Sequence, residues 1–418
     1  MKTLIIGSVW PEPASSGAGL RIMELIHLFL KQQWEVTFAS TAATTEHMSD
    51  LDALAVQSVP IVVNDNSFDL FIGKLQPDIV LFDRFTMEEQ FGWRVEKHCP
   101  QAMRIIETID LHCLRQARYL RFKRDQQIAL HVNQAELYND IAVREIAAIH
   151  RSDLSLLISD YEIELLQTHF NISPDIIHLC PFMFEKQHLH LSSPSFEERA
   201  HFVSIGNFHH APNWDAVLWM KQHIWPLIRS RLPDAQLHIY GAYAPPKAQA
   251  LHQPDCGFHI PGRAEQVSTV MQQARICLAP LRFGAGIKTK LADAMLNGTP
   301  SVTTAIGIEG MHRDLPWAGA VGDRAETLAD AAVSLYQNKE NWRQAQSNGF
   351  RIVQQLFDAQ SNGKALIQRV VQIMESLAAH RQQHFIGLML RHHHQRSTEF
   401  MSRWIEVKNR SARLNSNG

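Results

Sequence analysis

Short apolar runs alternate with longer segments of helical composition along most of the chain. In the first half, runs of strand length lie at residues 3–6, 35–39, 79–82, 104–108, 154–158 and 176–179. A second series of such runs lies at residues 202–205, 237–240, 258–260, 276–279 and 301–303. Helical stretches at 20–31 and 216–231 fall between them. Alternation of this kind predicts mostly parallel, doubly wound sheets.

A polar stretch at residues 185–199 separates the two series. It contains histidines, serines and Pro194, which is typical of an interdomain linker. The chain has 418 residues, enough for two or three domains. We therefore predict an α/β protein with two Rossmann-like domains that face each other across a cleft. The predicted domains are residues 1–190 and 191–375, followed by C-terminal helices in a tail at 376–418.

Composition narrows the class of protein. The chain has 40 Lys and Arg residues and 42 Asp and Glu residues, which gives a formal charge of -2. A charge this close to zero does not indicate nucleic acid as a partner. The five cysteines are scattered without CxxC spacing, which favours a reducing compartment over a disulfide frame or a zinc site. No apolar run approaches the roughly 20 residues that span a bilayer. We expect a cytoplasmic protein, with peripheral contact at the inner membrane face as a second expectation.

Residues 280–300 carry the most specific chemistry. A buried strand is followed by a loop with Gly284 and Gly286, and then by a predicted helix at 287–297. The start of such a helix offers backbone N–H groups and a positive dipole to a diphosphate, and Lys288 and Lys290 add charge. On the helix, Lys290 and Asp293 share one face, so a cation and a hydroxyl-binding carboxylate can address one ligand. The alternative is a solvated helix start with a surface acid.

This segment, PLRFGAGIKTKL, resembles the donor-binding loop of the retaining glycosyltransferases of family 4, which have the GT-B fold. Residues 298–304 and the Gly-Ile-Glu-Gly loop at 307–310 resemble the next family signature, and this likeness implies a donor-binding role for Glu309. Many members also carry two glutamates spaced E-x7-E. Here Asp293 falls at the second position and Ala285 at the first, so the usual contact to the donor sugar is missing.

A second glycine loop lies at residues 11–19, directly after the first strand. Open α/β sheets bind ligands at this edge. The loop lacks the G-x-G-x-x-G pattern of dinucleotide-binding proteins, and the second strand does not end with an acidic residue. Both features disfavour the binding of a nicotinamide cofactor. The resemblance places Gly17 and Gly19 near the donor phosphates and the acceptor. A plain surface turn is the alternative.

The segment Asp110-Leu111-His112 follows the strand at 104–108 and should open into the same cleft. A histidine there could bind a sugar hydroxyl or carry a proton near neutral pH. An ordinary loop histidine is the alternative. The resemblance includes a D-x-H motif and places the histidine near the donor sugar, so we expect His112 to contact the sugar and Asp110 to orient it.

The second domain opens with Gly206 and Asn207, which we predict to bind the donor. Many relatives supply an arginine and a lysine here as diphosphate clamps, whereas this chain offers amides and imidazoles. The charge must then come from Lys288, Lys290 and Arg263. A surface position is the alternative for Arg263.

A basic run lies at residues 115–124, with Arg115, Arg118, Arg121, Lys123 and Arg124. It could rest on anionic lipid or steer a phosphorylated acceptor, and a solvated helix face is the alternative.

Together these features predict transfer of a sugar from a nucleoside-diphosphate sugar to a hydroxyl of a glycan or lipid-linked acceptor, in cell-envelope polysaccharide or glycoconjugate synthesis. The resemblance implies retention of anomeric configuration. We expect no cofactor and no metal, because lysines replace the ion. Two alternatives bind the same donor: a nucleotide-sugar epimerase, and a non-catalytic partner protein.

Overall fold

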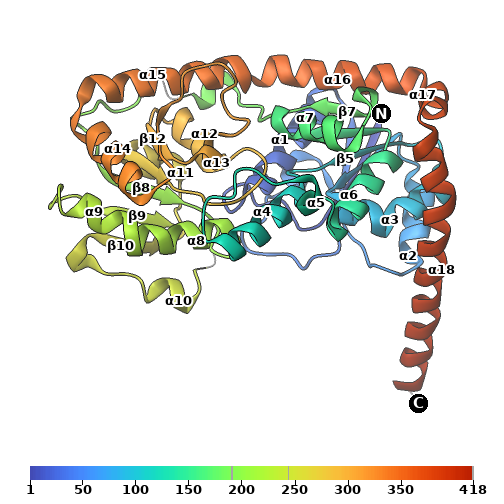
Figure 1. Ribbon diagram of the computed structural model, residues 1–418. Coiled ribbons are helices and arrows are strands. Elements are labelled where there is room, and N and C mark those ends of the chain that lie inside the picture. The colour runs from blue at the N-terminus through green and yellow to red at the C-terminus, as the bar shows by residue number, and fades with distance from the viewer. Residues whose placement is uncertain (190–191, 243, 417–418) are drawn as a thin grey trace.

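The computed structural model describes residues 1–189, 192–242 and 244–416, and two sheets lie side by side in it (Figure 1). The first sheet has seven strands in the order β3-β2-β1-β4-β5-β6-β7, and the second has six in the order β10-β9-β8-β11-β12-β13. The strand pairs described within each sheet are parallel. The predicted fold class, two Rossmann-like domains with C-terminal helices, is confirmed.

The strands form where the apolar runs predicted them, because a strand covered on both faces needs apolar residues throughout. The first sheet contains β1 (Lys2–Gly7), β2 (Glu35–Ser40), β3 (Gln57–Pro60), β4 (Ile79–Asp83), β5 (Met103–Glu107), β6 (Leu154–Leu157) and β7 (Ile177–Leu179). The second contains β8 (Ala200–Ile205), β9 (Leu237–Tyr240), β10 (Phe258–Gly262), β11 (Ala274–Ala279), β12 (Ser301–Thr303) and β13 (Gly319–Val321).

Helices connect these strands in each domain. The first domain holds α1 (Gly17–Lys31), α2 (Ser67–Leu75), α3 (Phe85–His98), α4 (His112–Asp125), α5 (Gln134–Leu137), α6 (Asp140–Arg151) and α7 (Asp160–Phe170). The second series is α8 (Ala211–Trp219), α9 (Trp225–Arg229), α10 (Pro246–Gln249), α11 (Val267–Gln273), α12 (Thr289–Leu296), α13 (Ala305–Ile308), α14 (Ala325–Gln337) and α15 (Lys339–Leu356). The chain ends with α16 (Ala359–Glu375), α17 (Leu377–Gln383) and α18 (Phe385–Ser416).

Two details differ from the sequence prediction. The edge strands β3 and β13 were not predicted, because they are short and lack a buried apolar run. The helix expected at 216–231 instead consists of α8 and α9 joined by a π-helical turn at Met220–Ile224. Pro226 lies in the first turn of α9, and a proline ring clashes with the carbonyl four residues earlier, which favours a wider turn.

The last helices return to the first domain. Figure 1 shows α16 running from the second domain across the first. Its residues Leu366, Val370 and Ile373 are buried in the core of the first domain, in one cluster with Ile5 and Leu25. The division at residues 190 and 375 remains a prediction, and it assigns to the second domain a helix that packs in the core of the first.

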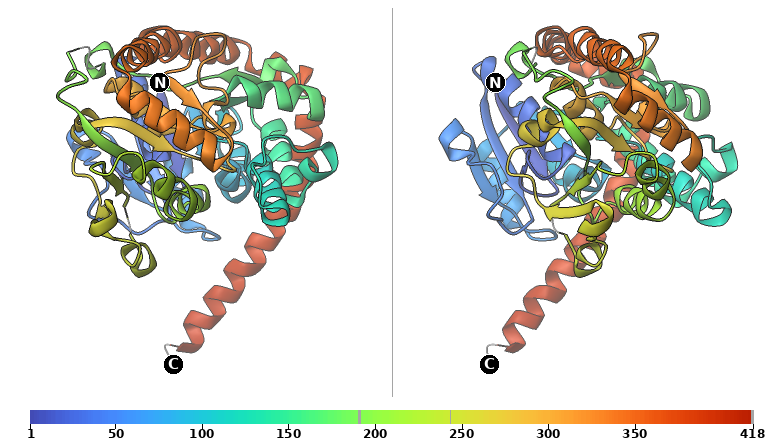
Figure 2. Two further views of the ribbon diagram at one scale, coloured as in Figure 1. Left: turned by 60° about the vertical axis from the view of Figure 1, so that its left-hand side comes forward. Right: turned by 90° about the vertical axis from the view of Figure 1, so that its left-hand side faces the viewer.

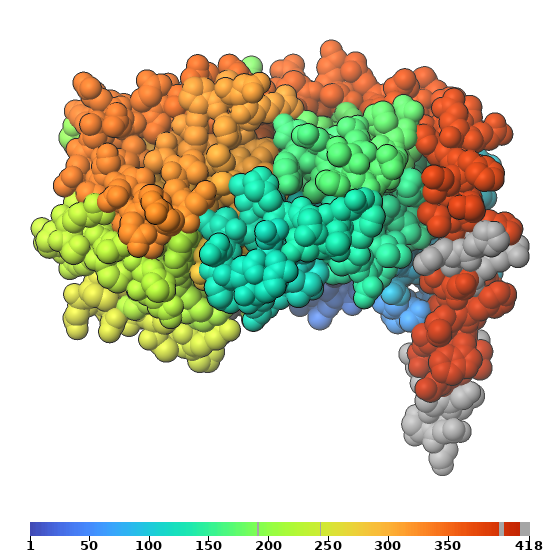
Figure 3. All heavy atoms as spheres, viewed as in Figure 1, coloured from blue at the N-terminus to red at the C-terminus, as the bar shows by residue number. Residues whose placement is uncertain are grey.

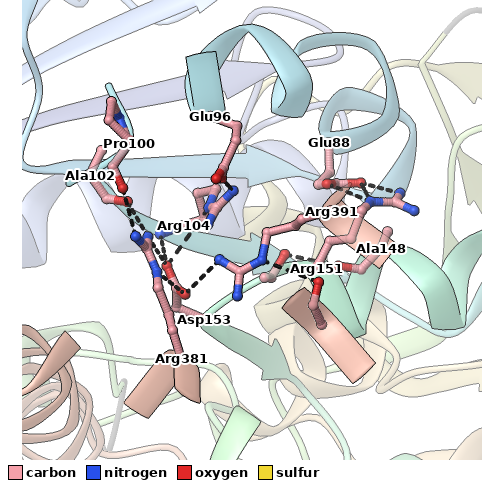
Figure 4. Close-up of polar contacts among 12 residues, drawn as sticks. Glu88, Glu96, Pro100, Ala102, Arg104, Ala148, Arg151, Asp153, Arg381 and Arg391 are labelled. Carbon is pink, nitrogen blue, oxygen red and sulfur yellow. Dashed lines mark hydrogen bonds and ion pairs between the residues drawn. The ribbon is translucent and has the colours of Figure 1, made fainter. Parts of the chain in front are cut away.

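Buried charges hold the following helices on the same domain. Asp153 is 2% exposed, and both of its carboxylate oxygens accept hydrogen bonds from Arg381 of α17 at 2.8 Å (Figure 4). The backbone N–H of Arg104 donates to the same carboxylate, and Arg391 of α18 lies 3.6 Å from it. These cations more than offset burial and hold the pKa of Asp153 below its ordinary value. The C-terminal helices are therefore anchored by a charge that stays ionised at neutral pH.

Candidate active site

A cavity of about 560 Å³ lies between the two domains. Its size is within the range of small-molecule sites. Both domains line it at the carboxyl ends of their strands, where open α/β sheets bind ligands. From the predicted set, the lining includes Gly17, Asp110, His112, Gly206, Asn207, Arg263, Gly284, Lys288, Lys290 and Asp293.

The glycine loop after β11 turns into α12 through backbone that favours glycine. Gly284 has a φ of 147° and Gly286 a φ of 63°. The helix begins at Thr289 and ends at Leu296, shorter at both ends than predicted, with Lys288 as an extended N-terminal cap. Lys290 and Asp293, three residues apart, both face the cavity. The predicted pairing of a cation with an acid on one face is present.

Burial sets the charges of these side chains. It lowers the pKa of Lys288 and of Lys290 to about 8, so both amines are mostly protonated at neutral pH. Burial, and then the nearby Glu24, raises the pKa of Asp293 to about 7. The Nζ of Lys290 donates to Oδ1 of Asn213 at 2.8 Å, which orients the amine. The α12 start thus offers two oriented cations and a carboxylate that titrates near neutral pH.

Gly17 brings the two domains into close contact. It is the first residue of α1 rather than a loop residue, because Ser16 caps the helix. A Cβ on Gly17 would lie 2.0 Å from Oγ1 of Thr289, the first residue of α12. Only glycine lets these two helix starts approach across the cavity.

Three predicted donor-binding residues are not among the described residues that line the cavity: Gly19, Gly286 and Glu309. The N–H of Gly19 donates to Oγ of Ser16 within the helix cap. The N–H of Gly286 donates to Oε1 of Glu162 at 2.8 Å. These backbone N–H groups already have partners within the protein, and the donor-binding role of Gly19 and Gly286 stays a prediction.

Glu309 is held by an arginine of the other domain. Its two carboxylate oxygens accept hydrogen bonds from Arg118 at 2.7 and 2.6 Å, and Arg118 also donates to the carbonyl of Gly284. The side chain of Arg118 is fully buried. This ion pair holds the glycine loop against the first domain, and a donor-binding role for Glu309 stays a prediction.

The first domain presents Asp110 and His112 from the turn between β5 and α4. Glu145 accepts hydrogen bonds from the backbone N–H groups of His112 and Cys113, both at 2.9 Å. Glu162 accepts from the N–H of Leu111 at 3.0 Å. Two buried carboxylates therefore cap the start of α4 and fix its first residue toward the cavity.

The two side chains lie together, as predicted. Nε2 of His112 is 3.6 Å from Oδ1 of Asp110. Burial lowers the pKa of His112 to about 4, so the imidazole is neutral at pH 7 and can both donate and accept hydrogen bonds. Burial raises the pKa of Asp110, but Arg115 and His112 more than offset this and lower it.

Arg115 lines the cavity, whereas the basic run that contains it was expected to contact lipid, to steer a phosphorylated acceptor or to form a solvated helix face. It donates to Oδ1 of Asp110 at 2.6 Å. Its position three residues after His112 on α4 was the available signal, because helical neighbours share a face. Arg84, also missed, lines the same wall in a left-handed backbone conformation with a φ of 74°.

The other arginines of the basic run are paired within the protein, while Lys123 is exposed beside the ring of Tyr119. Arg118 is buried with Glu309. Arg121 and Arg124 both pair with Glu136, and they also lie near Asp125. Such pairing leaves little free charge for a lipid surface or an anionic acceptor.

Among the described residues, no group of three or more His, Cys, Asp or Glu side chains is arranged to hold a metal ion. The metal-independent reaction stays a prediction. No described helix combines the length and apolar composition needed to cross a bilayer.

Comparisons with known proteins agree with this architecture. Residues 199–338 match the family model described as Glycosyl transferases group 1. An uncharacterized protein from the cps region of Klebsiella pneumoniae is 23% identical over 186 residues, 43% of this chain. The match spans 46% of that protein, less than half of its length.

Three solved structures share the fold over nearly the whole chain. Sucrose-phosphate synthase from Thermosynechococcus elongatus has a TM-score of 0.68 at 15% identity, covering 90% of this chain and 100% of that one. HepE from Anabaena, in complex with UDP and glucose, has a TM-score of 0.63 at 13% identity, covering 89% of this chain and 99% of that one. WaaG, a glycosyltransferase of lipopolysaccharide biosynthesis, has a TM-score of 0.60 at 12% identity, with coverages of 88% and 98%.

Proposed function

Because residues 199–338 form a group 1 glycosyltransferase domain within a chain that has the GT-B fold, we propose that this protein transfers a sugar from a nucleoside-diphosphate sugar to a hydroxyl group. The acceptor is a glycan or a lipid-linked glycan. The observation that carries the proposal is the cavity where Lys288, Lys290 and the α12 start meet Asp293. We also assign the chain to the subgroup with the P-L-R-F-G-A-G-I-K-x-K-L loop.

The second domain binds the donor in this proposal. Negative charge grows on the diphosphate as the bond to the sugar breaks, and preorganised cations stabilise that charge in a closed site. Lys288, Lys290 and Arg263 supply the cations, and Asp293 accepts hydrogen bonds from the ribose hydroxyls. The family resemblance supports retention, with the departing phosphate accepting the proton of the attacking hydroxyl on the same face of the sugar.

The first domain contributes the groups nearest to the sugar. His112 is neutral and can both donate to and accept from hydroxyls. Asp110 lies against the donor loop: a Cβ atom placed on Gly286 would be only 2.8 Å from the Cβ of Asp110. Many members of the family carry a glutamate at the position before Gly286, where this chain has Ala285. We assign the task of that glutamate, accepting a hydrogen bond from a sugar hydroxyl, to Asp110.

Asp110→Ala should remove the contribution of the sugar to donor binding. A hydrogen bond to a carboxylate is worth about 1.5–3 kcal/mol, so the nucleotide sugar should bind about 10- to 100-fold more weakly. Its nucleoside diphosphate should bind as it does to wild type. Calorimetric titration of both ligands measures the difference, with Asp293→Asn as the control that weakens both. Equal loss for both ligands in Asp110→Ala would contradict the assignment.

The affinity for the nucleotide sugar should pass through a maximum between pH 7 and pH 8. Below its pKa of about 7, Asp293 is protonated and loses the charge that accepts from ribose. Above their pKa of about 8, Lys288 and Lys290 lose the charge that attracts the diphosphate. In Asp293→Asn, the affinity measured by calorimetry should no longer fall below pH 7, whereas it should still fall above pH 8. A wild-type affinity that is constant from pH 6 to pH 9 would argue against these roles.

A binding panel followed by an acceptor screen tests the function itself. UDP and UDP-glucose are the first probes, because a solved structure with this fold contains UDP and glucose; other nucleoside diphosphates and their sugars follow. Transfer predicts release of nucleoside diphosphate that increases when an acceptor is added. A sugar epimer formed without acceptor would identify an epimerase, and binding without turnover would identify a partner protein.

The relatives indicate the setting of the reaction. WaaG acts in lipopolysaccharide biosynthesis, and the Klebsiella protein belongs to a cps region. We propose a role in the synthesis of a cell-envelope polysaccharide or glycoconjugate at the cytoplasmic side of the membrane.

A further inference from the structure

Helix α18 leaves a row of large apolar side chains uncovered. It packs against α3 and α6 of the first domain and then continues past them (Figure 1). Both views in Figure 2 show its C-terminal half extending away from the two domains, and Figure 3 shows this part standing clear of the surface. Between residues 397 and 409, where side chains are described, most of them are exposed.

The uncovered residues lie on one side of the helix. Ile386, Met389, Phe400, Trp404 and Val407 are spaced by multiples of a helical turn and form a single line, which we call the apolar stripe. Phe400, Trp404 and Val407 are 69%, 60% and 63% exposed. Phe385 and Met401 flank the stripe and are also exposed. Arg391 and Ser402, about half a turn away, are 7% and 3% exposed because they face the first domain.

Charge is sorted around the same helix. The two acids, Glu399 and Glu406, pair with Lys97 and Arg94 of α3. Lys408 lies beside the stripe, with its Nζ 5.3 Å from the ring centroid of Trp404. Arg403 lies on the other side of the stripe and is half-exposed.

The composition of this segment contrasts with the rest of the chain. From residue 385 onward the sequence has six Lys and Arg against two Asp and Glu, in a protein whose formal charge is -2. Of these cations, Arg391 is buried near Asp153, and Arg403 lies 2.6 Å from Glu399. Among the side chains that the structure describes, the stripe is therefore bordered by Lys408 on one side and by Arg403 on the other, while both acids of the helix also pair with α3.

We propose that the apolar stripe of α18 docks this protein on a bilayer surface that contains anionic lipid. A helix with aromatic residues on one side and cations along its edges lies in the interfacial plane, with the rings at headgroup depth and the cations at lipid phosphates. Lys and Arg stems also pack along apolar surface while their charges stay in water. The charge favours lipid over a second copy of this chain, because two copies would bring like charges together.

Vesicle co-sedimentation of the full-length protein tests this proposal. The first vesicles are phosphatidylcholine alone, and the second are equal parts phosphatidylcholine and phosphatidylglycerol. We expect binding to the anionic vesicles that weakens with added salt, because cation–phosphate attraction is screened. Phe400→Ser/Trp404→Ser should bind at least about tenfold more weakly, since two buried aromatic side chains are lost. Lys408→Gln should weaken binding to the anionic vesicles only.

The matched control is Val321→Ser, which removes an exposed apolar side chain from the edge strand β13 of the second domain and should leave vesicle binding unchanged. All replaced side chains are at the surface, and thermal melting checks that each variant is folded. No binding of wild type to anionic vesicles, or equal binding of wild type and the double variant, would overturn the proposal. A dimer in sedimentation equilibrium that the double variant dissociates, without vesicle binding, would assign the stripe to a second copy instead. The nucleotide panel is independent of these results.

Discussion

Lys290→Ala should lower kcat/KM for the nucleotide-sugar donor by about 100- to 1,000-fold, the loss typical of removing one preorganised group that stabilises developing charge. The amine is oriented by Asn213 and faces the cavity at the start of α12. It lies three residues before Asp293, on the same face of α12. Steady-state release of nucleoside diphosphate measures the effect, and the melting temperature should stay near that of wild type.

Lys247→Ala is the matched control for that experiment. Lys247 is an exposed lysine of the same domain, with its Nζ 4.5 Å from the ring centroid of Trp214. Its loss removes the same formal charge without touching the cavity and should leave the kinetics unchanged. Equal rates for Lys290→Ala and wild type would refute the donor-site assignment, and equal losses for both lysine variants would indicate a general charge effect.

Arg118→Met should destabilise the protein by about 3–5 kcal/mol, because removing one partner of a buried ion pair leaves the other charge uncompensated. Glu309 would lose both hydrogen bonds, and the carbonyls of Gly284 and Leu130 would lose their donor. The donor loop would also lose its attachment to the first domain, so turnover should fall with stability. Thermal and denaturant unfolding measure the first effect.

The double variant Arg118→Met/Glu309→Gln separates charge from packing. It should be more stable than Arg118→Met alone, since no buried charge is left unpaired. Arg124→Met, on the exposed side of the same helix, should leave the melting temperature unchanged, because exposed ion pairs contribute little. If Arg118→Met and Arg124→Met melted alike, the buried pair would not join the domains as described.

Local pattern was enough for much of the fold and for part of the site. The bounds of β9 and β12 match the short runs that predicted them. All five residues of β4 are buried, as expected for a parallel strand that is covered on both faces. Lys290 and Asp293 share a face because helical geometry places residues three apart side by side. The edge strands β3 and β13 escaped prediction, since half-exposed strands carry no such run.

The groups that join the two domains could not be predicted from local pattern. Arg118 and Glu309 are separated by 191 residues, and Glu162 and Gly286 by 124. The basic residues around Arg118 are typical of a solvated helix face, and the expectation for Glu309 came from the family resemblance of its loop. Only the packing of α4 against the donor loop shows that these charges neutralise each other.

The sequence by itself determined the two doubly wound domains, the glycine loop with its following helix, and the types of side chain that meet at the strand ends. These depend on period, length and backbone freedom, which are properties of neighbouring residues. The tertiary structure decided which charged side chains face the cavity, which of them pair with each other between the domains, and what pKa values they have. It also decided that α18 keeps its acids against the first domain and its aromatic residues in solvent. Burial and pairing depend on distances between remote segments, and these distances exist only once the chain has folded.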